Sequence, residues 1–215
     1  MSRYVDLSVP IATGMPVYPG DPAVELTPTA TVATHGCNVL GLRLGSHTGT
    51  HVDAPYHIDD SLPKLDELPL DRFVGPAVVV DARDAGPRAP LGPERFADVA
   101  RPGAIVLVAT GWSAHWGTET YQEHPYIDAE AARLLAEAGV ATVGIEGFSV
   151  DPTPDEAFAA HQALCGAGVV IAENLANLAE LVDAQAAGHA IEVSLLPLRL
   201  AQADGSPVRA VARVA

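Results

Sequence analysis

Short apolar runs rich in β-branched residues recur along the chain, and in its second half they alternate with helical patterns. The run at 104–109 (AIVLVA) is continuous, which is typical of a strand buried on both faces of a sheet. Comparable patterns predict strands at 4–9, 38–44, 77–80, 141–145, 168–172, 191–196 and 208–214, the last as an edge or terminal strand. A sheet that contains strands buried on both faces must be covered by other layers of the protein on both of its faces.

Three segments between these runs predict helices. Residues 128–138 (DAEAARLLAEA) begin with an Asp cap and are followed by Gly139. Residues 154–164 carry Pro, Asp and Glu in the first turn, and 175–186 form a third helix. The pattern predicts an α/β fold, a single domain of residues 1–215 with a mixed, layered β-sheet and helices. The Pro- and Gly-rich stretch 84–93 is expected to be a surface loop.

The charge balance excludes one class of partner. With 12 basic and 27 acidic residues, the chain has a formal net charge of −15 and would repel a nucleic-acid backbone. No apolar run reaches the roughly 20 residues of a membrane span, and the N-terminus has no secretory signal pattern. We therefore expect a cytoplasmic protein without a membrane partner. Cys37 and Cys165 are then expected to be reduced thiols.

The segment 46–57 (SHTGTHVDAPYH) gathers three histidines and an aspartate, His47, His51, Asp53 and His57. All four positions are odd, so in an extended chain they would project to the same side. Gly49 and Pro55 argue against a helix here. Several polar groups desolvated together are costly unless something binds them, and imidazole with carboxylate suits Zn²⁺, Mn²⁺ or Fe²⁺. The segment predicts a metal site whose shell needs further ligands from elsewhere. Four other histidines, at 35, 115, 124 and 189, lack such spacing and are expected at the surface.

The segment 47–57 resembles the HxGTHxDxPxH signature of the cyclase family, which includes bacterial kynurenine formamidases and isatin hydrolases. Further stretches match that family in type and order: MPVYPGDP at 15–22, TGW at 110–112, GIEGFSVDP at 144–152, HQ at 161–162 and ENL at 173–175. The resemblance thus covers nearly the whole chain and implies the family's swivelling β/β/α fold.

The resemblance also implies a set of roles. His47, His51 and Asp53 would bind a first metal, Asp53 would bridge to a second metal bound by His161, and Glu173 would bridge both. The cofactor would be one or two Zn²⁺ ions, with Mn²⁺ as an alternative, and His57 would be the proton shuttle. Family members are generally homodimers or tetramers, and the segment 10–22 would suit an arm that crosses to a partner.

The chemistry implied is metal-dependent amide hydrolysis. A divalent ion lowers the pKa of bound water from 15.7 towards about 7. An imidazole can act as a general acid near neutral pH, so His57 is the natural group to protonate the leaving nitrogen. Tyr18, Phe148 and Trp112, with Trp116, are candidate apolar walls for a small amide or lactam substrate.

The substrate stays open at this point. Kynurenine formamidases of the family, which act in tryptophan catabolism, usually read DTPSVDP where this chain has EGFSVDP at 146–152, and they carry Trp where Tyr18 stands. The arylformamidase reaction, the opening of a lactam or lactone ring and a secondary-metabolite cyclase are alternatives. A metal-binding protein without turnover is a further one.

Overall fold

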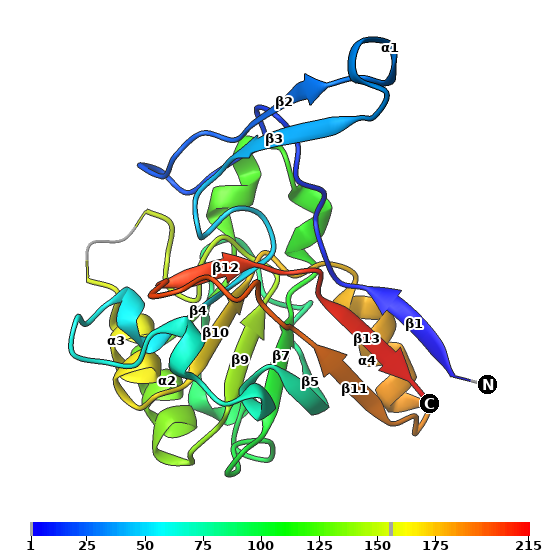
Figure 1. The fold of residues 1–215 in the computed structure, drawn as a ribbon. Helices are drawn as coiled ribbons and strands as arrows, with labels where there is room; N and C mark the ends of the chain where they lie inside the picture. Colours follow the sequence, from blue (N-terminus) through cyan, green and yellow to red (C-terminus); the bar gives the residue numbers. More distant parts are fainter. Residues whose placement is uncertain (1, 155–156) are drawn as a thin grey trace.

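A computed structural model describes residues 2–154 and 157–215 (Figure 1). Its main feature is a curled mixed sheet of nine strands in the described residues. In spatial order these are β1 (Arg3–Asp6), β13 (Val211–Val214), β11 (Ile191–Ser194), β5 (Val74–Asp81), β7 (Ile105–Ala109), β9 (Thr142–Ile145), β10 (Val170–Glu173), β4 (His51–Asp53) and β12 (Gly205–Pro207). The four central strands β5, β7, β9 and β10 run parallel, and the flanking strands pair antiparallel. The predicted mixed α/β sheet is confirmed.

The central strand β7 separates two hydrophobic cores. Its alternate residues Ile105, Leu107 and Ala109 belong to one core, which α4 (Leu178–Ala186) covers. The intervening Val106 and Val108 belong to the other core, which α2 (Ala129–Glu137) and α3 (Ala159–Gly166) cover. Burial of both faces explains why this strand is continuously apolar in sequence.

The helices differ from the prediction mainly at their N-termini. The α2 helix is capped as expected, with the Asp128 carboxylate accepting from the Ala131 N–H at 2.7 Å. The α3 helix begins at Ala159, after a left-handed Phe158, and α4 begins at Leu178, after a left-handed Asn177. Both begin later than predicted, because these left-handed residues end the preceding loops. Part of the predicted α3 segment, 155–156, lies outside the described residues.

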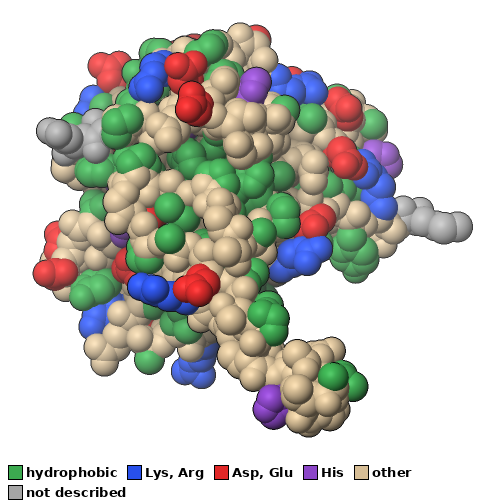
Figure 2. All heavy atoms as spheres, turned by 90° about the horizontal axis from the view of Figure 1, so that it is seen from above, with side chains coloured by type: hydrophobic (Ala, Val, Ile, Leu, Met, Phe, Trp, Pro, Cys, Tyr) green, Lys and Arg blue, Asp and Glu red, His purple; other side chains and the backbone are tan. Residues whose placement is uncertain are grey.

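A hairpin projects from the body of the protein. It consists of β2 (Glu25–Ala30) and β3 (Val39–Arg43), joined through the short helix α1 (Val32–His35) (Figure 1). Seen from above, it stands away from the rest of the molecule as a separate knob (Figure 2). The strand predicted at 38–44 is therefore present, but it pairs outside the main sheet. Four apolar side chains on this hairpin are exposed: Val32, Val39, Leu40 and Leu42.

Of the two places predicted for the strand at 208–214, edge or terminal, the second holds: β13 is the last strand in sequence. It is not an edge strand, because it pairs with β1 on one side and β11 on the other. The predicted loop 84–93 contains the short strand β6 (Pro90–Leu91), which pairs with β8 (Tyr126–Ile127). The remaining elements are single 3₁₀ turns: η1 (Pro55–His57), η2 (Leu65–Glu67), η3 (Leu70–Arg72), η4 (Pro93–Arg95), η5 (Trp112–His115) and η6 (Glu119–Glu123). Within the described residues, no helix has the length and apolar character needed to cross a membrane.

Candidate metal centre

The strand β4 lies between β10 and β12, and this pairing brings the predicted site together. In the β4–β10 register His51 faces Glu173, and in the β4–β12 register Asp53 faces Gly205. The helix α3 supplies His161, which packs beside the same strands. All five residues predicted to bind metal therefore meet in one cluster.

The two buried carboxylates each reach towards both halves of this cluster. Asp53 Oδ1 lies 2.7 Å from His47 Nδ1 and 3.3 Å from His51 Nε2, and its Oδ2 lies 3.8 Å from His161 Nε2. Glu173 Oε2 lies 3.5 Å from His51 Nε2, and its Oε1 lies 3.5 Å from His161 Nε2. Glu173 Oε1 also accepts from the Val150 N–H at 2.9 Å. Two groups of three residues that could hold a metal share Asp53: one is His47, His51 and Asp53, and the other is Asp53, His161 and Glu173. A third such group, His47, His57 and Asp204, lies beside them.

Each imidazole uses its outer nitrogen to bind an oxygen acceptor. His51 Nδ1 donates to the Gly49 carbonyl at 2.8 Å, and His161 Nδ1 donates to Asp151 Oδ2 at 2.7 Å. His47 Nε2 donates to Asp204 Oδ2 at 2.8 Å. A carbonyl or ionised carboxylate only accepts, so in the neutral ring the lone pair is on the inner nitrogen. Metal-binding histidines are typically oriented by such a second hydrogen bond.

Two atoms at the centre test whether a cation fits. Among the described residues, His51 Nε2 and Asp53 Oδ2 are buried side-chain polar atoms without a hydrogen-bond partner. His51 is 2% exposed and Asp53 0%, and leaving such groups unsatisfied is costly. A divalent ion would satisfy both, and the nitrogen and oxygen donors suit Zn²⁺ or Mn²⁺. The residues present fit a metal.

The charges in the cluster shift its titrations. Burial disfavours the imidazolium of His47, but Asp53 and Asp204 outweigh burial and raise its pKa to about 9. Burial likewise opposes the charge on His161, while Asp151 and Asp53 raise its pKa to about 10. Burial alone would raise the pKa of Asp53, but His51 and His47 hold it well below its usual value. Without a metal, protons therefore take the place of the missing positive charge.

The local backbone differs from the predicted extended segment. Only His51–Asp53 form a strand, while His47 lies in a turn and His57 in the 3₁₀ turn η1. Gly49 has φ +62, and Pro55 opens η1, so the chain bends at both ends of β4. The prediction of one extended face is thus wrong for His47 and His57, although both still reach the cluster.

His57 sits on the solvent side of the cluster. Its ring centroid lies 4.1 Å from that of His47 and 5.7 Å from that of His161. Its side chain is 31% exposed, and its Nδ1 lies 3.6 Å from Asp204 Oδ2. The ring is therefore close to the cluster without being enclosed by it.

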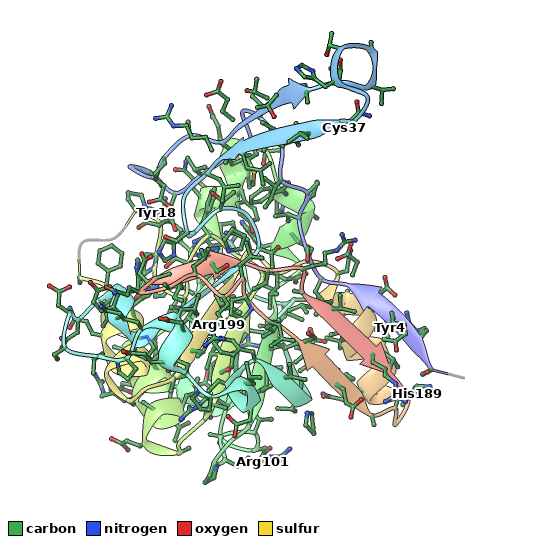
Figure 3. The ribbon with its side chains drawn as sticks, in the orientation of Figure 1. Tyr4, Tyr18, Cys37, Arg101, His189 and Arg199 are labelled. Carbon is green, nitrogen blue, oxygen red and sulfur yellow. The ribbon has the colours of Figure 1, made fainter. Side chains whose placement is uncertain are left out.

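A cavity of about 230 Å³ opens onto the cluster. Its walls include Tyr18 and Phe148, whose rings are arranged edge to face with their centroids 6.5 Å apart. Tyr18 lies on the N-terminal loop, between the projecting hairpin and the sheet (Figure 3). Trp112 does not line the cavity. It packs with Phe148 in an aromatic cluster and donates from Nε1 to the Thr120 carbonyl at 3.2 Å, so direct contact of Trp112 with substrate stays a prediction.

Sequence reasoning missed several residues of this region. Asp151 falls within the recognised motif at 144–152, but Asp204 has no signal of its own in the sequence. Asp21, Ser149, Phe158 and Asn174 line the cavity unexpectedly. His124, expected at the surface, is buried. Its Nδ1 donates to the Pro125 carbonyl at 2.9 Å, its Nε2 is hydrogen-bonded to Thr153 Oγ1 at 2.8 Å, and burial lowers its pKa.

Comparisons with known proteins identify the family of the chain. A sequence model described as a putative cyclase matches residues 5–152. A kynurenine formamidase from Bordetella petrii is 35% identical, with 99% of each chain covered, and one from Salinibacter ruber is 37% identical, with 97% of this chain and 96% of the relative covered. The chain therefore belongs to the cyclase family.

Solved structures point the same way. Isatin hydrolase A from Labrenzia aggregata, bound to benzyl benzoate, superposes with a TM-score of 0.86 at 26% identity, covering 99% of this chain and 94% of that one. A potential metal-dependent hydrolase with cyclase activity superposes with a TM-score of 0.80 at 26% identity, covering 99% and 98%. Within the cyclase family, the chain is a hydrolase.

Proposed function

We propose that this hydrolase cleaves the amide bond of a small aryl-formamide, as an arylformamidase of the kynurenine formamidase type. The observation that carries the proposal is the buried cluster, in which His51 Nε2 and Asp53 Oδ2 lack partners and every imidazole is oriented from outside. Full-length similarity to kynurenine formamidases supports the substrate class.

The cluster would hold one or two Zn²⁺ or Mn²⁺ ions, with His47, His51 and Asp53 on one side and His161 on the other. Asp53 and Glu173 would serve both sides, since each directs one oxygen to each. Bound metal would supply Lewis acidity and make a water molecule more acidic. The orienting partners Asp151 and Asp204 would keep the imidazoles in place during turnover.

His57 is proposed as the proton carrier. Its ring borders the cavity beside the cluster and remains in contact with solvent. In this role it takes a proton from the attacking water and gives it to the leaving amide nitrogen, which is a poor leaving group until it is protonated. Tyr18 and Phe148 would enclose an aromatic substrate, because their rings form one wall of the cavity.

A second candidate is the opening of a lactam ring. The close fold match to isatin hydrolase A at 26% identity favours it, and so do the aromatic cavity walls. Assays of N-formylkynurenine and isatin in parallel, with metal-loaded protein, separate the two. Cleavage of neither, with metal fully bound, would contradict both and favour a metal-binding protein without turnover. Elemental analysis of protein purified without chelators would give the stoichiometry: two ions per chain support the bridging roles of Asp53 and Glu173, and one ion contradicts them.

The protein is further proposed to work as a homo-oligomer, a dimer or tetramer, in the cytoplasm. The projecting hairpin exposes four apolar side chains, among them Leu40 and Leu42, which a second copy would cover. The loop 10–22, in contrast, contributes Tyr18 and Asp21 to the cavity of its own chain. The free cysteines Cys37 and Cys165 suit a reducing compartment. Light scattering that gives a monomer would contradict the oligomer.

A further inference from the structure

We propose that Asp204 is a positioning residue that fixes the ring of His47 and orients His57 towards the reacting bond. The proposal rests on the hydrolase function proposed above. It concerns a residue far along the chain from the histidine-rich segment, and it follows from the contacts of a single carboxylate oxygen.

The strand pairing brings Asp204 to the site. Ala54, the residue after β4, donates its N–H to the Asp204 carbonyl at 2.8 Å, and Gly205 lies opposite Asp53. The approach is very close, because a Cβ on Gly205 would stand 2.7 Å from the Val52 carbonyl and 3.0 Å from His47 Cε1. The backbone of β12 thus packs directly against the His47 ring. Asp204, the residue before β12, lies beside that ring.

The first contact fixes the tautomer of His47. Asp204 Oδ2 accepts from His47 Nε2 at 2.8 Å, and His47 Nδ1 points to Asp53 Oδ1 at 2.7 Å. An ionised carboxylate cannot donate, so both ring nitrogens of His47 carry a proton as long as each faces a carboxylate. When a metal takes the place of the Nδ1 proton, the hydrogen bond to Asp204 keeps the remaining proton on Nε2. The His47 ring is therefore held between two carboxylates, Asp53 inside the site and Asp204 outside it.

The second contact reaches the proton carrier. The same Oδ2 lies 3.6 Å from His57 Nδ1, slightly beyond a hydrogen bond, and the two imidazole rings lie 4.1 Å apart at 43°. The negative charge of Asp204 attracts the N–H edge of His57, so that its other nitrogen, Nε2, exchanges the proton with substrate. One oxygen thereby sets the position of the proton carrier relative to a metal ligand.

The test compares Asp204→Asn and Asp204→Glu with Asp98→Asn, a matched change at an exposed aspartate outside the site. Zn²⁺ titration is expected to show affinity 10–100-fold weaker in Asp204→Asn. At saturating Zn²⁺ we expect its kcat to fall at least tenfold with KM nearly unchanged. Asp204→Glu should restore part of both losses, and Asp98→Asn should behave as the wild type. Nitrogen-15 NMR of the imidazoles should show His47 protonated at Nε2 in the zinc-loaded wild type and perturbed in Asp204→Asn.

Three results would overturn the proposal. One is wild-type kcat and unchanged imidazole signals in metal-saturated Asp204→Asn. Another is complete loss of metal in that variant, as expected for His51→Ala, which would make Asp204 a ligand itself. The third is His47 protonated at Nδ1, and not at Nε2, in the zinc-loaded wild type. If the wild type cleaves no amide at all, the proposed function fails separately, and Zn²⁺ affinity with the His47 signals still decides the role of Asp204 towards His47.

Discussion

His51 and Glu173 face each other across the antiparallel pair β4–β10, with His51 Nε2 3.5 Å from Glu173 Oε2. Because side chains alternate along a strand, a slip of one residue would turn Glu173 to the opposite face of the sheet. The sheet register therefore determines the composition of the cluster. The same holds for Asp53 and Gly205 across β4–β12.

Replacing His51 or His57 should separate metal binding from proton transfer. His51→Ala is expected to lose both bound metal and activity, because His51 lies at the buried centre of the cluster. His57→Ala is expected to keep its metal and to lose about 10²–10⁴-fold in kcat, the usual contribution of general acid–base catalysis. Elemental analysis and kinetics on the same preparations measure both. Full activity of His57→Ala would exclude the proton-carrier role.

Gly205→Ala should weaken both the folded structure and metal binding, because it disturbs the packing of β12 against the cluster. The added Cβ would approach the Val52 carbonyl and His47 Cε1 too closely, which forces β12 away from β4. Overpacking of this kind costs about 1–3 kcal/mol, and we expect a lower Tm together with weaker metal binding. Gly166→Ala is the matched control, since nothing lies within 4 Å of its added Cβ. Equal Tm and metal affinity in the two variants would show that the close approach is unimportant.

The metal-free protein should lose stability as pH rises from about 6.5 to between 9 and 10. The pKa of His47 is raised to about 9 and that of His161 to about 10, from an ordinary value of 6.5. Groups whose pKa is higher in the folded state stabilise it fully below the unfolded pKa, and that stabilisation disappears as pH rises through the folded pKa.

Thermal unfolding with chelator across this window measures the effect. Added Zn²⁺ should remove the decline, because the ion replaces the protons and binds more tightly as they leave. A Tm of the chelated protein that rises between pH 6.5 and 9 would contradict this assignment of the protons.

Phe148→Ala should weaken substrate binding more than catalysis. Phe148 forms a cavity wall, and loss of its apolar contact with an aromatic substrate, worth about 1.5–3 kcal/mol, should raise KM about tenfold or more with a smaller change in kcat. Trp112→Phe is the comparison, since Trp112 lies behind that wall. Steady-state kinetics with one substrate measures both variants, and a larger KM effect at Trp112 would restore its predicted contact with substrate.

Much of the fold could be predicted because the burial of a strand or helix determines which of its positions are apolar in the sequence. The residues of β7 face two cores, so apolar residues occupy every position. The place of β13 could not be predicted in this way. Its pattern is that of a half-buried strand, and the pattern does not say which strands lie beside it.

In the site, too, some residues could be predicted from the sequence and others could not. The spacing of His47, His51 and Asp53 predicts a metal site, because three such groups rarely occur so close together by chance. His161 and Glu173 look ordinary by themselves, and only the family resemblance predicts that they belong to it. Asp204 has no such signal, since its role depends on the β4–β12 register, which spacing along the chain does not encode. The surface position predicted for His124 is wrong, because the side chain is buried against Gly147, where a Cβ would lie 2.8 Å from His124 Nδ1.

The pairing of β1 with β13 has a consequence for the order of events during synthesis. Residues 3–6 leave the ribosome long before residues 211–214, with which they pair. The histidine-rich segment likewise waits for Asp204 and β12. A nascent chain therefore carries the histidines long before it can enclose them, and contacts this distant in sequence form slowly. A metal ion bound at this cluster would therefore be enclosed only after β12 has joined the sheet.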